Sequence, residues 1–156
     1  MSKILVLNTG LNGENSNSNK FTQMYLAVRK SSGLKDDITV RDLDAEALPH
    51  LSAEEMQAWM TPSDERDEKQ QSIAALSDSL IAELQSHETI VIGMPMYNMG
   101  IPSTFKAYID RIARAGKTFT YTENSTWKRL KSPLEKLVVI PCTTCCMKRG
   151  MNRCYD

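Results

Sequence analysis

The residues best suited to chemistry are the sequence Pro-Met-Tyr-Asn at residues 95–98, which directly follows an apolar run at residues 89–92. An apolar parallel strand that ends in such a loop places the loop at the carboxyl edge of a sheet, where planar cofactors bind in open α/β folds. The amide of Asn98 offers both a donor and an acceptor to a heterocycle, and Tyr97 and Met99 offer apolar walls. An ordinary strand-to-helix connection explains the pattern equally well. Both interpretations stay open at this point.

A second loop, at residues 9–18, is rich in small polar residues and lies between a β-rich segment and an amphipathic one. The N–H groups and the dipole of a helix that starts there favour a phosphate, and Ser16 and Ser18 add hydroxyl donors. Neither a P-loop signature nor a G-x-G-x-x-G match is present, which disfavours a nucleoside triphosphate and a dinucleotide. A phosphate held by hydroxyls and backbone suits FMN. The alternative is a polar loop in which Ser18 simply caps the helix.

The apolar periodicity predicts the elements that position these loops. A short helix over residues 52–60 interrupts an otherwise irregular segment at residues 45–64, and a ribbon follows at residues 118–121. The main helices are expected over residues 19–30 (with Phe21, Met24, Tyr25 and Val28 on its apolar face), 63–86 and 103–114, and the strands over residues 3–8, 37–43, 88–94 and 134–140. Strands that alternate with helices predict an α/β fold with a doubly wound parallel sheet in three layers.

Composition excludes several classes of protein. The 156 residues suit one domain, and 24% charged residues argues against disorder. The 19 basic and 19 acidic residues balance, so no general affinity for nucleic acid or for an anionic membrane is expected. No apolar run approaches the length of a membrane span or of a signal-peptide core. We therefore expect a cytoplasmic protein.

The cysteines and histidines offer no convincing site. All four cysteines lie within residues 142–154. The two-residue gap between Cys142 and Cys145 resembles half of a zinc site, but Cys154 stands alone and no histidine follows, so no metal is predicted. His50 and His87 are far upstream and are expected to be structural. Because no Ser-His-Asp or Cys-His set can be assembled, no side chain is predicted to be catalytic.

Several motifs together carry a family resemblance. They comprise Ser-Asn-Ser at residues 16–18, the Pro-Met-Tyr-Asn loop at residues 95–98, Phe-Lys-Ala-Tyr-Ile-Asp at 105–110, Ala-Arg-Ala-Gly-Lys-Thr-Phe at 113–119 and Tyr-Thr-Glu-Asn at 121–124. Over residues 1–140 the chain resembles the bacterial FMN-dependent NADH-azoreductases. Those enzymes are also NADH:quinone oxidoreductases, and they have a flavodoxin-like fold.

The resemblance implies a homodimer that binds FMN and uses NADH as co-substrate. NADH would reduce the flavin and leave before a quinone or an aromatic azo compound is reduced, which is a ping-pong mechanism; the flavin carries the chemistry. The resemblance implies a role for nine residues: Ser16, Asn17 and Ser18 on the phosphate, Met96, Tyr97, Asn98 and Met99 along the ribityl chain and the isoalloxazine edge, and Phe119 and Tyr121 beside the substrate cleft.

The chain departs from the family in two places. Gly10 stands where the family usually has a serine that contacts FMN. The fourth strand leads into a cysteine-rich stretch instead of a Ser-Arg-Gly-Gly-like flavin loop, and the last strand and helix of the fold are missing. We therefore expect residues 1–140 to form an incomplete flavodoxin-like FMN-binding domain and residues 141–156 to form an irregular cysteine-rich tail.

The missing elements predict impaired activity. They would leave the fourth strand as an exposed apolar edge, with weak retention of FMN and a tendency to aggregate. Two other functions stay open. One is a non-catalytic remnant that binds no flavin. The other is a flavodoxin-type electron carrier, which the balanced charge disfavours because such carriers dock through strongly acidic surfaces.

Overall fold

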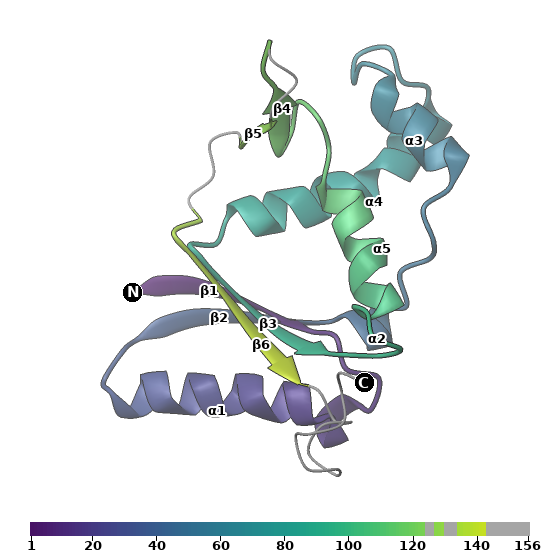
Figure 1. Cartoon of the computed structure of the whole chain (residues 1–156). Helices are drawn as coiled ribbons and strands as arrows, with labels where there is room; N and C mark the ends of the chain where they lie inside the picture. Colours follow the sequence, from purple (N-terminus) through teal and green to yellow (C-terminus); the bar gives the residue numbers. More distant parts are fainter. Residues whose placement is uncertain (124–126, 130–133, 143–156) are drawn as a thin grey trace.

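A four-stranded parallel sheet forms the centre of the molecule (Figure 1). The computed structural model describes residues 1–123, 127–129 and 134–142. The strands of the sheet, in the order β2-β1-β3-β6, are β2 (Asp36–Asp42), β1 (Ser2–Asn8), β3 (Thr89–Pro95) and β6 (Lys136–Cys142). All three strand pairs are parallel. This is the doubly wound order expected of a flavodoxin-like fold, so the predicted fold class is confirmed.

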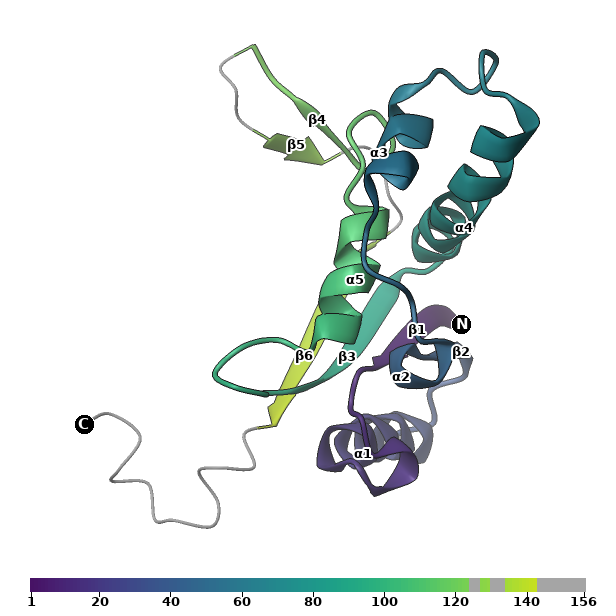
Figure 2. The ribbon, with the colours of Figure 1, turned by 90° about the vertical axis from the view of Figure 1, so that its right-hand side faces the viewer.

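Helices cover both faces of the sheet and complete the three layers (Figures 1 and 2). One face carries α1 (Asn17–Ser31), and the other carries α2 (Leu43–Glu46), α4 (Glu68–Gln85) and α5 (Ser103–Ile112). A short helix, α3 (Ala53–Met60), packs beside α4. None of the helices in the described part of the chain is long and apolar enough to cross a bilayer.

The core has two parts because side chains alternate between the faces of each strand. On the α1 side, Ile4, Val6 and Val91 form a small cluster. On the opposite side the cluster is larger and includes Leu5, Leu7, Leu43, Leu80, Ile90, Ile92, Phe105 and Tyr108. Burial raises the pKa of the Tyr108 hydroxyl. The continuous apolar runs of β1 and β3 are typical of strands that are buried on both faces.

Helix α1 begins earlier than the sequence predicted, and its buried face is more polar. Ser16, not Ser18, is the N-cap residue, and Ser18 lies inside the first turn with Thr22 on the sheet side. Met24 and Val28, which were expected on the apolar face, are exposed. The reason is the small distance between α1 and β3. Only small side chains fit between the helix and the strand at Gly93, and the residues of α1 that lie there are Ser18 and Thr22.

Three other boundaries differ from the predictions. Helix α4 starts at Glu68 instead of residue 63 because Asp67 and Gln70 form a capping box there. The segment predicted to be irregular from residue 45 already contains the end of α2, which Asp42 caps. Strand β6 continues through Cys142, which pairs with Pro95, so the first two residues of the predicted irregular tail belong to the sheet. Residues 143–156 and Asn124 lie outside the described part of the chain, and the two-part division stays a prediction.

The predicted ribbon is present. Strand β4 (Phe119–Tyr121) pairs with the antiparallel strand β5 (Trp127–Arg129). Helix α5 carries the chain away from the carboxyl edge of the sheet, so the ribbon lies at the far end of α5 (Figures 1 and 2). The aromatic rings of Phe119 and Tyr121 meet edge to face, with their centroids 5.4 Å apart.

A buried ion pair fixes α3 against α5. The guanidinium of Arg111 is fully buried, and its Nε and Nη2 donate to Oε1 and Oε2 of Glu55 at 3.0 and 2.9 Å. Its Nη1 also donates to the carbonyls of Pro49 and Ala107. Each nitrogen of the guanidinium thus donates at least one hydrogen bond, and Glu55 supplies the counter-charge. Loss of that carboxylate would leave a buried cation without its counter-charge.

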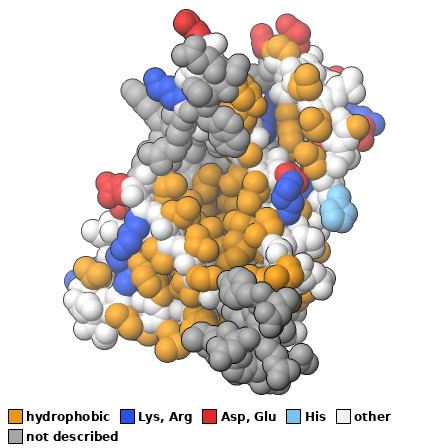
Figure 3. Space-filling view, in the orientation of Figure 1, with side chains coloured by type: hydrophobic (Ala, Val, Ile, Leu, Met, Phe, Trp, Pro, Cys, Tyr) orange, Lys and Arg blue, Asp and Glu red, His pale blue; other side chains and the backbone are white. Residues whose placement is uncertain are grey.

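Strand β6 is an edge strand within the described residues, and its outer part is apolar. Leu137 and Val139 point to the side of α4 and α5 and are 58% and 46% exposed. In Figure 3 hydrophobic side chains gather in the middle of the face on which β6 lies, between the helices above and α1 below. The expectation that the fourth strand forms an exposed apolar edge is therefore confirmed within this part of the chain.

The buried ion pair generates a stability prediction. Replacing Glu55 with Gln keeps the capping box with Ser52 but removes the charge, and we expect the free energy of unfolding to fall by about 3 kcal/mol because Arg111 keeps a buried charge. The matched control is Glu54→Gln, which removes an exposed ion pair with Lys69 and should change stability little. Urea denaturation of the three proteins measures both effects. Equal midpoints for the two variants would contradict a stabilising role for the buried pair.

Candidate functional site

The loop after β1 and the start of α1 form a cradle for an anion. The carbonyl of Ser16 accepts from the N–H of Lys20 and so begins the helix, but the Ser16 side chain makes no cap hydrogen bond. Its hydroxyl pairs instead with the hydroxyl of Ser18 at 2.9 Å, and both residues are buried. The first N–H groups of α1 are therefore left without a side-chain cap, and two hydroxyls lie beside them. This combination is the usual site for a phosphate.

Backbone and side-chain contacts hold this loop in place. A single helical turn, η1 (Gly13–Asn15), precedes Ser16, and the side-chain amide of Asn19 donates to the carbonyl of Gly13 at 2.9 Å. At the other end of the loop, the Thr9 hydroxyl donates to the carbonyl of Gly93 at 2.7 Å. The cradle is thus fastened to both α1 and β3. Asn17, the third residue predicted to hold a phosphate, is the first residue of α1 and has an exposed side chain.

The loop after β3 is a tight, strained turn. The N–H of Tyr97 donates to the carbonyl of Gly100 at 3.1 Å, and the N–H of Gly100 donates back to the carbonyl of Tyr97 at 2.9 Å. Asn98 and Met99 lie between them with φ of 48° and 63°. Two consecutive positive φ values are typical of a type I′ turn. Asn tolerates this conformation, whereas Met adopts it at an energetic cost.

The two loops meet at the carboxyl edge of the sheet. The hydroxyl of Tyr97 accepts from the N–H of Leu11 at 3.1 Å, which joins the segment after β1 to the segment after β3. The N–H of Met96 donates to the carbonyl of Cys142 at 2.9 Å, so β6 reaches the same edge. A cavity of about 770 Å³ lies here; its lining residues are Leu11, Met96, Tyr97, Asn98, Gly100, Ile101, Pro102 and Ser103.

This arrangement fits FMN. A phosphate would replace the Ser16–Ser18 hydrogen bond with bonds from both hydroxyls, and it would lie at the positive end of α1. The exposed apolar side chains of Leu11, Met96 and Ile101 line the cavity beside it, as a planar ring system requires. The site thus offers polar groups for a phosphate and apolar walls for a ring, within two loops that a direct hydrogen bond joins.

Phe119 and Tyr121 are not part of this cavity. They lie on the ribbon at the far end of α5, where Phe119 helps to line a separate cavity of about 600 Å³ whose other lining residues are Leu51, Met56, Trp59, Met60, Asp110, Ala113, Arg114 and Ala115. The guanidinium of Arg114 lies 5.2 Å from the centre of the Trp59 ring and donates to Asp78 at 2.7 Å. The structure therefore brings seven of the nine predicted site residues to the carboxyl edge and places two elsewhere.

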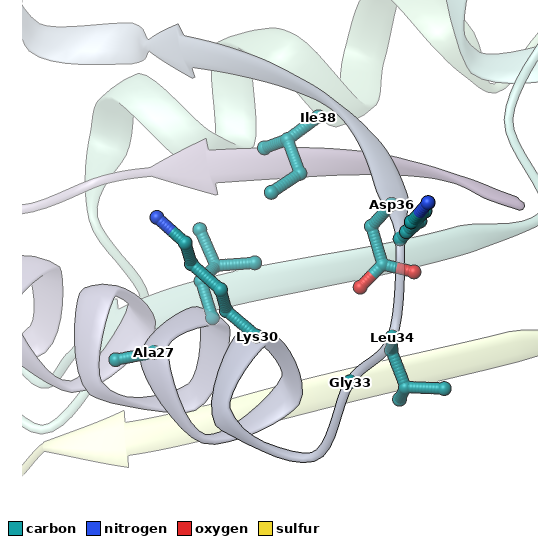
Figure 4. Close-up of a pocket in the computed structure, with 8 residues that line it drawn as sticks. Ala27, Lys30, Gly33, Leu34, Asp36 and Ile38 are labelled. Atoms are coloured by element: carbon teal, nitrogen blue, oxygen red, sulfur yellow. The ribbon is translucent and has the colours of Figure 1, made fainter.

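A third cavity, between the end of α1 and the start of β2, shows no comparable chemistry (Figure 4). Leu34 and Ile38 form part of its apolar lining, and Lys30 lies at its side. Its carboxylate, from Asp36, is already held by Nε and Nη2 of Arg29 at 2.7 and 2.8 Å. This hydrogen bonding holds the pKa of Asp36 below its ordinary value.

The histidines and potential metal ligands offer no further site in the described part of the chain. His87 is buried after α4, where Nδ1 lies 2.7 Å from the Glu83 carbonyl and Nε2 lies 3.0 Å from the Thr39 hydroxyl. These contacts give it the structural role expected from the sequence. No cluster of potential metal ligands occurs among the described residues, to which Cys145, Cys146 and Cys154 do not belong.

Sequence reasoning missed two contributors to the site. Leu11 supplies both the N–H that binds Tyr97 and an apolar wall, and its sequence signal was a lone apolar residue within a polar turn. Ile101 lines the same cavity, but its position between Gly100 and Pro102 suggested only a connection. Neither residue belongs to a periodic pattern, so only the fold could place them.

Comparison with known proteins agrees with this geometry. A family model described as a flavodoxin-like fold matches residues 2–147. The chain is 49% identical over 123 residues to the FMN-dependent NADH:quinone oxidoreductase of Pseudoalteromonas atlantica. This alignment covers 78% of this chain and 60% of that protein. It is 44% identical over 131 residues to the protein of the same name from Photorhabdus laumondii. That alignment covers 84% of this chain and 66% of the other protein. The chain thus spans about three fifths of the length of such relatives.

Comparison with solved structures finds azoreductases of similar fold. The azoreductase from Bacillus anthracis superposes with a TM-score of 0.80 at 26% identity, covering 92% of this chain and 69% of the other. A B. anthracis FMN-dependent NADH-azoreductase solved in complex with FMN superposes with a TM-score of 0.77 at the same identity and coverage. The family resemblance inferred from the sequence motifs is confirmed.

The strained turn generates a second stability prediction. Met99 is 85% exposed and has φ of 63°, so Met99→Gly removes backbone strain without removing buried contacts. Relief of about 1–2 kcal/mol, less the entropy cost of glycine, should raise the free energy of unfolding by about 0.5–1 kcal/mol. The control is Met96→Gly in the same loop, where φ is not positive. Denaturant titration should show opposite signs for the two variants, and a loss of stability in both would argue against the turn.

Proposed function

This chain belongs to the flavodoxin-like fold family, and on that premise we propose that it binds FMN and uses NADH to reduce quinones and aromatic azo compounds. The observation that carries the proposal is the hydrogen bond between the N–H of Leu11 and the hydroxyl of Tyr97. It joins the phosphate cradle to the loop that would border the flavin ring. The names of the relatives support the same activity, cofactor and co-substrate.

The chain's own residues would bind and orient the cofactor. Ser16, Asn17 and Ser18 would hold the phosphate through hydroxyls and N–H groups, and residues 96–99 would lie along the ribityl chain and the edge of the ring. Bound FMN supplies the hydride chemistry, first as acceptor from NADH and then as donor to the quinone or azo substrate. No side chain needs to act as an acid or a base. NADH and the second substrate would use the same open cavity in turn, as a ping-pong mechanism requires.

We also propose a homodimer whose substrate cleft needs both copies. Helix α5 has ten residues and is therefore about 15 Å long, and it separates Ser103 in the cofactor cavity from the ribbon that carries Phe119 and Tyr121. The two cavities share no lining residue. If these aromatic residues border a substrate cleft beside FMN, they must do so at the flavin of a second copy. Twofold symmetry then gives two equivalent sites.

A cytoplasmic location completes the proposal. NADH, the proposed co-substrate, is a cytoplasmic reductant. The buried thiol of Cys142 is free, which suits a reducing compartment.

Flavin binding and turnover test the proposed activity. The full chain should quench the fluorescence of added FMN, and the complex should oxidise NADH in the presence of a benzoquinone. Without a quinone and without oxygen, one equivalent of NADH should bleach the flavin absorbance. Ser18→Asp places a negative charge in the buried cradle and should abolish FMN binding, whereas Ser79→Asp on the exposed side of α4 should not. Wild-type protein that binds no FMN would refute the activity.

Mixing two damaged proteins tests the shared cleft. Ser18→Asp damages the cofactor loop, and the double variant Phe119→Ala, Tyr121→Ala damages the ribbon. Each protein alone should be nearly inactive, but subunit exchange should restore roughly a quarter of wild-type turnover, because half of the dimers would carry one intact site of two. No recovery in a mixture that sedimentation shows to be dimeric would place both halves of the site within one chain.

A further inference from the structure

We propose that Asn19 is a positioning residue for the phosphate of FMN. Its side-chain amide ties the start of α1 to the turn before it and orients the two hydroxyls of the cradle. This inference rests on the proposed function, because it concerns the phosphate of the same cofactor. It goes further by assigning a role to a residue that does not line the cofactor cavity and that no sequence motif singled out.

Asn19 is a polar side chain in a buried place. It belongs to the first turn of α1 and is only 2% exposed. A buried amide without partners lowers the stability of a protein, so its donor and its acceptor both need hydrogen bonds. Both have them. Nδ2 donates to the carbonyl of Gly13 at 2.9 Å, and Oδ1 accepts from the hydroxyl of Ser18 at 3.4 Å.

These contacts close a circuit of hydrogen bonds around the cradle. The hydroxyl of Ser18 has one proton, and when that proton is donated to Asn19, the 2.9 Å contact between the two hydroxyls must be donated by Ser16. The N–H of Ser16 donates to the carbonyl of Gly13 at 3.1 Å, which is the same oxygen that accepts from Asn19. The circuit therefore fixes both hydroxyls and the turn η1 relative to α1.

The position of Asn19 in the helix explains why an amide suits it. It is the third helical residue after the N-cap Ser16, where a glutamate or glutamine commonly accepts from the N–H of the N-cap residue. Here that N–H is already bonded to the carbonyl of Gly13, so residue 19 donates to the same carbonyl instead. A carboxylate could not donate, and it would bring a negative charge beside the phosphate. The amide supplies a donor and an acceptor without a charge.

Asn19 acts through its neighbours and does not itself bind the ligand. The contact from Ser18 to Asn19 is long for a hydroxyl hydrogen bond and is therefore weak. A phosphate oxygen can take that proton at little cost, while the bond from Asn19 to Gly13 stays in place. The apolar walls of the cavity belong to Leu11 and the loop after β3, so loss of Asn19 should affect only ligands that have a phosphate.

Three variants test this role. Asn19→Leu removes both hydrogen bonds at similar size and should weaken FMN binding about tenfold, which corresponds to one net hydrogen bond. Asn19→Asp keeps the shape and the acceptor but loses the donor and adds a charge, so it should weaken FMN binding about a hundredfold. The matched control is Thr22→Val, which lies on the same buried face of α1 and loses a hydroxyl that bonds to Asn8. Because this hydroxyl does not contact the cradle, its loss should leave the affinity for FMN nearly unchanged.

Fluorescence titrations of FMN, and of riboflavin as a probe with the same ring but no phosphate, compare the wild-type chain with these variants. Thermal unfolding of the flavin-free proteins checks that each variant folds. Weaker binding of FMN in both Asn19 variants, more so in Asn19→Asp, with unchanged binding of riboflavin supports the inference.

Three results would overturn the inference and leave the proposed function standing. The first is an unchanged affinity of Asn19→Leu for FMN. The second is a loss that is equal for FMN and riboflavin, or equal in Asn19→Leu and Thr22→Val. The third is the failure of both Asn19 variants to fold, which would make Asn19 a residue of the fold alone. A wild-type chain that binds no FMN removes the proposed function and this inference together.

Discussion

The contact on which the site depends is the close approach of α1 to β3 at Gly93. A side chain there would collide with the carbonyl of Ser18 and the methyl group of Thr22, each 2.9 Å from its Cβ position. Because residue 93 is glycine, the helix backbone can rest almost directly on the strand. Its first turn is thereby held at the carboxyl edge of the sheet, level with the loop after β3. The small size of Ser18 and Thr22 on the buried face of α1 follows from the same contact.

The two ends of α5 lie in different surroundings: loops that border a cavity at its start, and ion pairs with α3 and α4 near its end. At its start, the chain makes hydrogen-bonded loops with exposed apolar side chains, which is suitable for a ligand. At its end, Arg111 and Arg114 tie α5 to α3 and α4 through Glu55 and Asp78. Charged and buried contacts of this kind are costly to break. The end of α5 is therefore a firm base for the ribbon.

Much of the fold could be predicted from the sequence because buried parallel strands leave continuous apolar runs, and those runs fix which loops share an edge. The start of α1 directly after Ser16 could not be predicted, since a serine at position 16 or at position 18 suits an N-cap and only the turn at residues 13–15 decides between them. The positive φ of Met99 could not be predicted either, because methionine is not typical of turns that require a positive φ. The separation of Phe119 and Tyr121 from the cofactor loops depends on the direction of α5, which no local pattern contains.

The exposed side of β6 has a consequence for handling the protein. Leu137 and Val139 offer apolar surface on β6, which is an edge strand within the described residues, and such an edge can pair with another strand. Association through apolar surface strengthens on warming and weakens in the cold. Losses by precipitation should therefore be smallest on ice and increase on warming. Purification and storage in the cold would keep the protein in solution longest.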